Sequence, residues 1–361
     1  MTAFRNLRRT ATVACLGLGV VASAETLTVV SWGGSYEQAS RKAILEPFSK
    51  ETGIEIRVET YNGGLAQVRA QVETGKVYWD VVDFEMADAS RGCDEGLLEY
   101  VDVDDLAPAP DGTPPAEDFF EGTVIDCGGG LLFYSTIYAY NADSFPDEKP
   151  STIDDFFDLD RFPGRRGMRR APQVNLEFAL LADGVSVEEV YDTLGTPAGM
   201  SRAYRKLDTI KDDIVWWEAG AQPPQMLADR EVVMSTAYNG RIFNAQVVEN
   251  QPFVVVWDGQ VLDSGTMGIV TGTPNLEAAR KLVRYATRSE VQAAVGRYIS
   301  YSPARHSGTK LISTHLATGV DMVPHMPTSP QNMKRVLYND WEWWSDHADD
   351  VNERFSAWLA R

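Results

Sequence analysis

The chain has 361 residues, enough for a large core and two lobes, and its 44% hydrophobic and 24% charged residues are typical of a globular protein. The formal net charge is −19, and no long block of basic residues follows the first ten positions. A nucleic-acid partner is therefore not expected, because binding a phosphate backbone requires a basic track.

The first 24 residues have the pattern of a secretory signal peptide. Three arginines lie near the start, an uncharged run follows at residues 11–21, and a small-x-small cleavage site stands at residues 22–24. The uncharged run is about half of the ~20 residues that a membrane-spanning helix needs, so we expect cleavage rather than anchoring. The mature chain would begin at Glu25 and act outside the cytoplasm, where ATP and NAD are scarce.

Strand and helix patterns alternate along the mature chain, which predicts an α/β fold. Residues 27–31 are rich in β-branched residues and predict a strand, a Gly-Gly turn follows, and residues 36–52 carry a helical apolar stripe. The other expected elements are strand 54–59, helix 65–75, strand 79–84, a Pro- and Asp-rich surface loop 108–118, strand 131–141, a short helix and loop 152–162, helices 175–183, 187–193 and 242–249, strand 253–257, and helices 276–287, 289–299 and 340–359. No linker divides the chain, so we expect two lobes that exchange segments.

Catalytic signatures are missing from the sequence. It has no G-x-S-x-G, H-E-x-x-H, P-loop or G-x-G-x-x-G motif, and none of its four histidines is paired at helical spacing with another histidine or a cysteine. The glycines at 128–130 do not lie between a strand and a helix start, so we interpret them as a flexible or tightly packed bend rather than a phosphate cradle. We expect no enzyme, no metal and no cofactor; a secreted hydrolase is the alternative from another class.

Two cysteines, Cys93 and Cys127, remain once Cys15 leaves with the signal peptide. In an oxidising compartment such a pair is more often a disulfide than two free thiols. Closing a loop of this size would stabilise the fold by roughly 3–4 kcal/mol in the chain-entropy model. Two buried thiols are the alternative.

Aromatic residues lie mostly at predicted strand ends or in turns, where open α/β sheets bind ligands. Their faces attract cations, and nearby carboxylates accept N–H bonds, so the set suits an alkyl-ammonium group. For any one of them, ordinary packing is the simpler interpretation. The set is Trp32, Tyr36, Tyr61, Tyr134, Tyr138, Tyr238 and Tyr301.

Five segments, in order, resemble the spermidine/putrescine-type periplasmic solute-binding proteins of ABC transporters. They are LTVVSWGGSYEQASRKAILEPFSKETGIEIRVETY, WDVVDFEMADASRGCDEGLLEYVD, CGGGLLFYSTIYAYN, STAYNGRIFNAQ and ISYSPA. The resemblance implies a two-lobed α/β periplasmic binding protein fold of type II, with crossing strands around a central ligand cleft. We expect residues 25–135 with 262–304 to form one lobe, and residues 136–261 with 305–361 to form the other.

The resemblance also implies ligand-binding positions. Trp32 would stack on the alkyl chain of the ligand, Ser35 lies in the turn after it, and Glu85 would hold an ammonium group. The remaining implied contacts are Asn175, Glu177, Tyr238, Asp263, Tyr301, Asp340 and Trp341.

The sequence departs from the family pattern in the segment LDSGTMGIV. Asp263 stands near the usual aromatic position and Gly265 near the position of the main carboxylate that grips an amine. Arg241 follows the Asn-Gly turn and, if it points inward, would favour a carboxylate or another anion. A surface or structural arginine is the other interpretation.

We therefore predict a periplasmic, monomeric binding protein that captures a polyamine or related small amine and delivers it to the permease of an ABC importer. Another small organic solute, such as an amino acid, betaine or carboxylate, is the alternative ligand. A receptor that docks on a sensor protein is a further possibility that the sequence does not separate from transport.

Overall fold

The computed structural model describes residues 25–361, so the predicted signal peptide lies outside the described residues. In this part of the chain, eleven strands join in one sheet with the main order β2-β1-β3-β9-β5-β8-β6-β7. The strands are β1 (Thr26–Ser31), β2 (Glu55–Thr60), β3 (Val81–Glu85), β4 (Val124–Ile125), β5 (Gly128–Asn141), β6 (Arg166–Arg169), β7 (Ile214–Trp217), β8 (Met234–Tyr238), β9 (Phe253–Ile269), β10 (Ser302–Pro303) and β11 (Val336–Tyr338).

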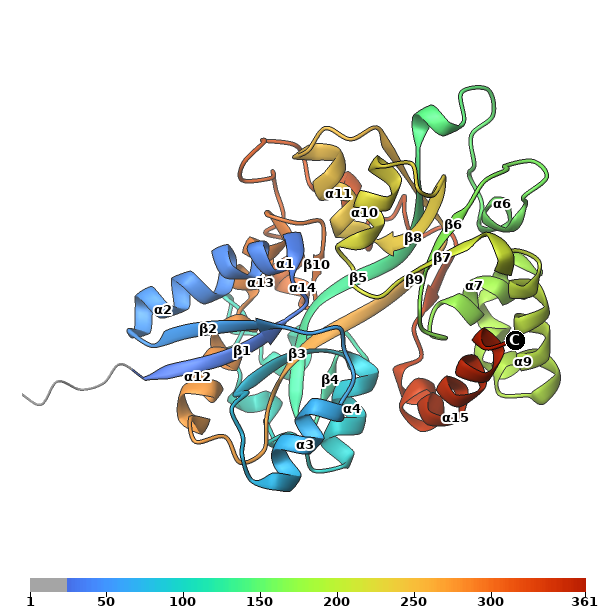
Figure 1. Ribbon diagram of the computed structural model, residues 1–361. Coiled ribbons are helices and arrows are strands. Elements are labelled where there is room, and N and C mark those ends of the chain that lie inside the picture. The colour runs from blue at the N-terminus through green and yellow to red at the C-terminus, as the bar shows by residue number, and fades with distance from the viewer. Residues whose placement is uncertain (1–24) are drawn as a thin grey trace, which may run out of the picture.

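The helices cover the sheet on its two sides, as expected for an α/β fold (Figure 1). They are α1 (Gly34–Ser40), α2 (Glu46–Thr52), α3 (Ala66–Thr74), α4 (Met86–Asp94), α5 (Pro115–Asp118), α6 (Ile153–Phe157), α7 (Asn175–Ala182), α8 (Val190–Leu194), α9 (Pro197–Asp208), α10 (Gln222–Ala228), α11 (Asn239–Val247), α12 (Leu276–Ala286), α13 (Ser289–Gly296), α14 (His306–Thr309) and α15 (Trp341–Leu359). A π-helical stretch, Arg41–Leu45, joins α1 to α2, so the predicted helix 36–52 is continuous. The sequence patterns did not predict β6, β7, α9 or α10.

Two long strands cross between the halves of the molecule. β5 and β9 pair antiparallel from Gly130 opposite Thr266 to Asn141 opposite Phe253. Figure 1 shows them running from β1–β3, which we call the first lobe, to β6–β8 with α7, α9 and α15, which we call the second lobe. The expected crossing strands are confirmed, whereas the lobe boundaries given above stay a prediction.

Two local predictions about these crossing strands are wrong. β9 was expected over 253–257 and extends to Ile269, because β3 and β5 flank it and pair with residues that are poor strand formers. Residues 128–130 form the start of β5 and not a bend. They are packed tightly, since a Cβ atom on Gly129 would lie 2.8 Å from Leu106.

The second lobe has an aromatic-rich core beneath α15. Trp344, Phe355 and Trp358 of this helix are buried and pack with Phe156 and Phe178. The helix is attached to the second lobe by indole hydrogen bonds from Trp344 to Glu177 of α7 and from Trp358 to Asp208 of α9, and it also packs against α4. The predicted helix 340–359 is confirmed, with Asp340 accepting a hydrogen bond from the Trp343 backbone N–H as the N-cap.

The predicted disulfide is present between α4 and the segment before β5. The Cys93 and Cys127 sulfur atoms are 2.03 Å apart, and their Cα atoms are separated by 5.7 Å. The bond closes a loop with a sequence separation of 34 and ties α4 to the crossing strand. It therefore braces the edge of the first lobe.

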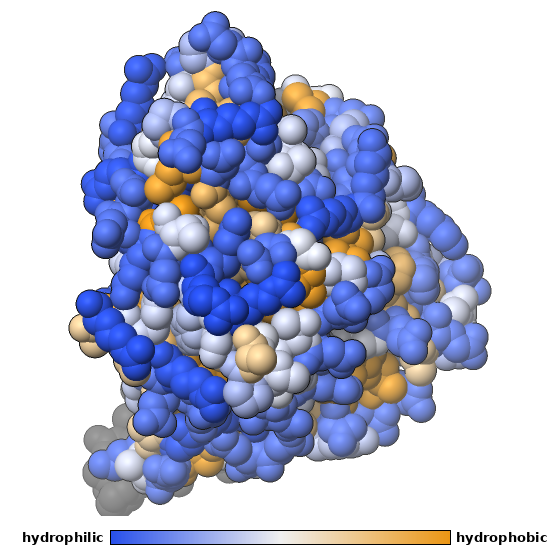
Figure 2. Space-filling model, turned by 90° about the vertical axis from the view of Figure 1, so that its right-hand side faces the viewer, coloured by the Kyte–Doolittle hydropathy of each residue, from blue (hydrophilic) through white to orange (hydrophobic). Residues whose placement is uncertain are grey.

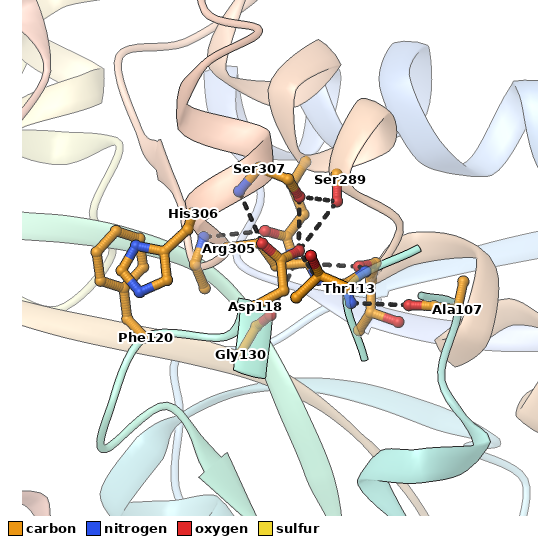
Figure 3. Close-up of polar contacts among 12 residues, drawn as sticks. Ala107, Thr113, Asp118, Phe120, Gly130, Ser289, Arg305, His306 and Ser307 are labelled. Atoms are coloured by element: carbon orange, nitrogen blue, oxygen red, sulfur yellow. Dashed lines mark hydrogen bonds and ion pairs between the residues drawn. The ribbon is translucent and has the colours of Figure 1, made fainter. Parts of the chain in front are cut away.

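The segment predicted as a surface loop over 108–118 ends in a buried ion pair (Figure 3). Asp118 Oδ2 lies 2.9 Å from Arg305 Nε, and Asp118 also accepts hydrogen bonds from Ser307 and Ser289. Arg305 donates to the Ala107 carbonyl at 2.7 Å. The end of this segment is therefore interior, with Asp118 3% exposed and paired with the fully buried Arg305.

The molecular surface viewed in Figure 2 is mainly hydrophilic, with apolar side chains in small separate areas. Within residues 25–361, none of the helices combines the length and apolar character required to cross a membrane.

Candidate ligand-binding site

The carboxyl ends of β1, β3 and β8 meet at the centre of the sheet, where β5 and β9 cross. Their order in the sheet brings residues from both lobes around one cavity of about 40 Å³. Such a position is the usual ligand site of an open α/β sheet. The lining residues are Trp32, Tyr36, Asp83, Phe84, Glu85, Leu132, Tyr134, Tyr238, Arg241, Gly265 and Tyr301.

Arg241 reaches the cavity from α11 and bonds across the cleft to the turn after β1. Its terminal nitrogens donate to the carbonyls of Trp32 and Gly33, each at 3.0 Å. Gly34 has φ of 60° and allows this close approach, since a Cβ atom there would lie 2.5 Å from Arg241 Nη1. Arg241 Nε is buried and has no hydrogen-bond partner among the described residues. The guanidinium thus retains N–H donors without a partner, that of Nε among them.

Asp83 places a carboxyl group in the same cavity. It lies on β3, is 2% exposed, and accepts a hydrogen bond of 2.5 Å from the Tyr36 hydroxyl. Burial raises the pKa of Asp83 to about 7, and the hydrogen bond from Tyr36 opposes this shift. A cationic ligand group beside Asp83 would favour its ionised form.

Glu85 ends β3 and is already paired across the cleft. Its Oε1 atom lies 2.8 Å from Arg169 Nη1 of β6, and the Tyr238 hydroxyl donates to the same oxygen at 3.3 Å. Glu85 thus lines the cavity where we expected it, but an ammonium group would have to compete with Arg169 for its carboxylate.

Aromatic rings form the walls of the cavity. Tyr36 and Tyr301 have ring centroids 5.5 Å apart, and Tyr134 and Tyr238 are also separated by 5.5 Å. Trp32 packs on Tyr61 behind it at 4.7 Å. These faces suit the alkyl part and the cationic end of a small ligand.

Asp263 lies just behind this wall. Its Oδ2 atom accepts hydrogen bonds from the Tyr134 hydroxyl at 3.0 Å and from the Asn339 amide at 2.9 Å. Burial raises the pKa of Asp263 to about 7. In this conformation Asp263 therefore positions Tyr134 and does not itself line the cavity.

Other residues singled out from the sequence lie away from the cavity. Ser35 is in the first turn of α1, and Asn175 donates its amide to the carbonyls of Arg169 and Ala171, each at 2.7 Å. Asp340 caps α15, and Trp341 donates from its indole to the Gly122 carbonyl at 3.0 Å. Of the ten positions that the resemblance implied, Trp32, Glu85, Tyr238 and Tyr301 come together at the cavity.

Glu177 is buried in the second lobe under α15. Its Oε1 atom accepts from the Trp344 indole at 2.7 Å and from the Tyr191 hydroxyl at 3.2 Å, while Oε2 has no hydrogen-bond partner in residues 25–361. Burial raises the pKa of Glu177 to about 7. Its contacts are those of a core residue of the second lobe.

We expect Glu177→Gln to raise the free energy of unfolding at about pH 8 by about 1–3 kcal/mol. The folded protein binds the Glu177 proton more tightly than the unfolded chain does, because burial raises this pKa. The resulting stabilisation is full below the ordinary pKa and is lost as pH rises through about 7. Glutamine keeps an acceptor for Trp344 without the buried charge. Urea unfolding of both proteins at about pH 5 and pH 8 measures the difference.

The exposed Glu188 supplies the control, since Glu188→Gln should change stability by less than about 0.5 kcal/mol at either pH. Equal stabilities of wild type and Glu177→Gln at the higher pH would contradict a buried carboxylate that is costly to ionise.

Two charged residues were not proposed from the sequence: Asp83, which lines the cavity, and Arg169, which pairs with Glu85 beside it. Asp83 stands inside the apolar run WDVVDF. An acidic residue in a strand that is covered on both faces could have identified it as a candidate site residue. Arg241 was considered, and the structure selects the inward-pointing interpretation. Within the described residues, no group of three or more His, Cys, Asp or Glu side chains could hold a metal ion.

Comparisons with known proteins identify relatives over most of this chain. The γ-aminobutyric acid-binding protein of Pseudomonas aeruginosa is 41% identical over 340 residues, which are 94% of this chain and 92% of that protein. An ABC transporter substrate-binding protein from Bradyrhizobium japonicum is 32% identical with a TM-score of 0.80, covering 93% of this chain and 99% of that one. A GABA receptor structure is 30% identical with a TM-score of 0.78, covering 93% and 98%.

A family model described as bacterial extracellular solute-binding protein matches residues 43–317. This match and the solved relatives confirm the two-lobed α/β fold, and they place the chain among proteins that bind solutes rather than among enzymes. The chain belongs to the bacterial extracellular solute-binding protein family.

Proposed function

We propose that this protein captures a small zwitterion with separated ammonium and carboxylate groups, of the γ-aminobutyric acid type. The observation that carries the proposal is the presence of Asp83 and Arg241 on one small, aromatic-lined cavity. A ligand with one charge of each sign neutralises both groups when water is expelled. A dication or a dianion leaves one of them facing a like charge.

The carboxylate of the ligand would lie at Arg241. Guanidinium groups are suited to carboxylates because their N–H donors are fixed in a plane, and Nε of Arg241 is a donor without a partner among the described residues. Burial strengthens such a contact, and Arg241 is 3% exposed.

The ammonium of the ligand would lie at Asp83. Tyr36, Tyr301 and Trp32 surround this end of the cavity, so that a cation meets ring faces and one carboxylate together. The Tyr36 hydroxyl already donates to Asp83, which fixes the orientation of the carboxyl group. The ionised form of Asp83 is the one that this contact requires.

A polyamine is the second candidate, favoured by the aromatic walls and by the three carboxyl groups of Asp83, Glu85 and Asp263. Two features weigh against it. Glu85 is neutralised by Arg169, and a second ammonium group would approach the Arg241 guanidinium.

The bound solute would be delivered to the permease of an ABC importer. This part of the proposal rests on family membership and on relatives named for γ-aminobutyric acid and for an ABC transporter. Arg241 and Arg169 reach across the cleft, so ligand binding there favours the closed form. A periplasmic location belongs to the same proposal.

Calorimetry and thermal unfolding with residues 25–361 test the ligand class. The matched ligands are γ-aminobutyrate, 1,4-diaminobutane and butyrate, which share a four-carbon chain and differ in their end groups. We expect γ-aminobutyrate alone to bind tightly, and at 100 times its Kd it should stabilise the protein by about 2.7 kcal/mol. Binding of the diamine in preference to the zwitterion would overturn the proposal in favour of a polyamine, and tighter binding of butyrate would favour a simple carboxylate.

A further inference from the structure

A second cavity lies between the lobes next to the ligand cavity, on the side of α4 and α15. Its volume is about 170 Å³, larger than the 40 Å³ of the first. Its lining includes the polar side chains of Asp88, Arg91, Gln173, Ser345 and Asn352.

The ion pair between Glu85 and Arg169 stands where the two cavities meet. Glu85 lines both of them, and Arg169 lines the second while lying 2.8 Å from Glu85. The two side chains are 11% and 18% exposed, so they fill this position largely away from solvent. Tyr238, which lines the first cavity, donates to the same Glu85 oxygen.

The Glu85–Arg169 pair is formed by residues of both lobes, and its position is fixed by further contacts. Glu85 ends β3 of the first lobe, and Arg169 ends β6 of the second. The Asn175 amide at the start of α7 binds the carbonyl of Arg169 and so holds the backbone that carries it. The pair therefore joins the two lobes beside the ligand cavity.

We propose that the Glu85–Arg169 pair determines solute length, acting as a partition between the ligand cavity and the second cavity. This inference rests on the proposed function, since it assumes an amino-acid-type solute in the first cavity. With the partition in place, a short ω-amino acid fills the site. Without it, the site continues into a polar space that accepts the extension of a longer ω-amino acid or of an amino-acid conjugate.

The ionised pair gives the partition its strength. A ligand tail that pushed past it would have to separate two largely buried opposite charges, and breaking such a pair leaves each charge uncompensated. Asp88, which accepts a hydrogen bond from the Gly64 backbone N–H at 2.8 Å, lines the space beyond. A polar or cationic tail would find acceptors there, whereas an apolar tail would not.

The test compares affinities along a series of ω-amino acids, β-alanine, γ-aminobutyrate, δ-aminovalerate and ε-aminocaproate, by calorimetry. The variant is Glu85→Gln with Arg169→Ala, which opens the passage and leaves no unpaired charge. We expect the affinity of ε-aminocaproate relative to γ-aminobutyrate to rise by about tenfold. With its carboxylate held at Arg241, the longer chain can place its ammonium group beside Asp88 in the second cavity and bury two more methylene groups in the opened passage. Thermal unfolding of each variant verifies that it is folded.

Two further variants complete the design. Glu85→Gln with Arg169→Met keeps the bulk without the charges, and we expect it to retain most of the wild-type length preference. Arg170 and Glu218 form a neighbouring pair that is 57% and 63% exposed, so Arg170→Ala with Glu218→Gln makes the same kind of change away from the cavities and should have no effect.

If the affinity of ε-aminocaproate relative to γ-aminobutyrate is unchanged in the Ala variant, the proposed partition is wrong. An equal rise in the Ala and Met variants would also overturn it, since charge loss and not the opened passage would then set the preference. If the Ala variant binds every member of the series more weakly by the same factor, the pair only stabilises the contact between the lobes, and the proposal that it determines solute length is overturned. If neither wild type nor variant binds any member, the proposed function fails and the partition with it.

Discussion

Arg241→Gln is expected to weaken γ-aminobutyrate binding by about 30-fold or more, about 2–5 kcal/mol. The substitution removes the buried guanidinium whose Nε has no partner among the described residues, and a ligand carboxylate then enters the cavity without a compensating charge. Glutamine retains one donor but not the planar fork or the charge. Calorimetry of both proteins at about pH 8 measures the change.

The loss of affinity in Arg241→Gln has two contributions, from the contact with the ligand carboxylate and from lobe closure, and matched ligands separate them. Arg241 also donates across the cleft to Trp32 and Gly33, so the substitution weakens lobe closure for every ligand. Butylamine has the ammonium end but no carboxylate, and its affinity reports closure alone. We expect γ-aminobutyrate to lose at least tenfold more affinity than butylamine does.

Arg230 provides the matched control for Arg241. It is exposed, forms a surface pair with Asp143, and Arg230→Gln should leave the affinity unchanged. An Arg241→Gln protein that binds γ-aminobutyrate as tightly as wild type would remove Arg241 from the site and with it the argument for a carboxylate ligand.

Affinity for γ-aminobutyrate should rise with pH between about 5.5 and 8, by up to about tenfold per pH unit below 7, and Asp83→Asn should abolish the rise. Burial raises the pKa of Asp83 to about 7 in the empty site, so its carboxyl group is mostly protonated in mild acid. The ligand ammonium needs the ionised form, and binding below pH 7 therefore releases a proton. The ligand's own groups titrate near 4 and above 10, outside this range.

The same variant should bind γ-aminobutyrate more weakly at about pH 8, by about 2–4 kcal/mol, because a buried ammonium then lacks its carboxylate. Calorimetry in buffers of different ionisation enthalpy measures both the affinity and the number of protons released. Asp263→Asn distinguishes the two carboxyl groups, since burial also raises the pKa of Asp263 to about 7. If the rise of affinity with pH persists in Asp83→Asn and disappears in Asp263→Asn, the ammonium contact belongs to Asp263.

Much of the first lobe could be predicted from short sequence patterns. The β-branched run at residues 27–31 forms β1, and the apolar stripe of residues 276–287 forms α12, because each pattern matches the period of its element. The disulfide between Cys93 and Cys127 followed from composition and compartment. Trp32, Glu85, Tyr238 and Tyr301 were proposed from motif order, and each lines the cavity.

The rest depends on contacts between residues distant in sequence, which no local pattern records. β9 continues through Asp263, Ser264 and Gly265 because β5 pairs with all three residues, and β3 pairs with the strand from Gly265 onward. Asp83 accepts a hydrogen bond from the hydroxyl of Tyr36, which is 47 residues away in the sequence, and Glu85 pairs with Arg169, which is 84 residues away.

Arg241 meets Gly33 across 208 residues of sequence. A charged side chain has no assignable role until folding shows which opposite charge, carbonyl or empty space it faces, because burial and Coulomb interactions depend on distance in space. The arrangement of opposite charges around this cavity is therefore a property of the tertiary structure, and the proposal of a zwitterionic ligand rests on it.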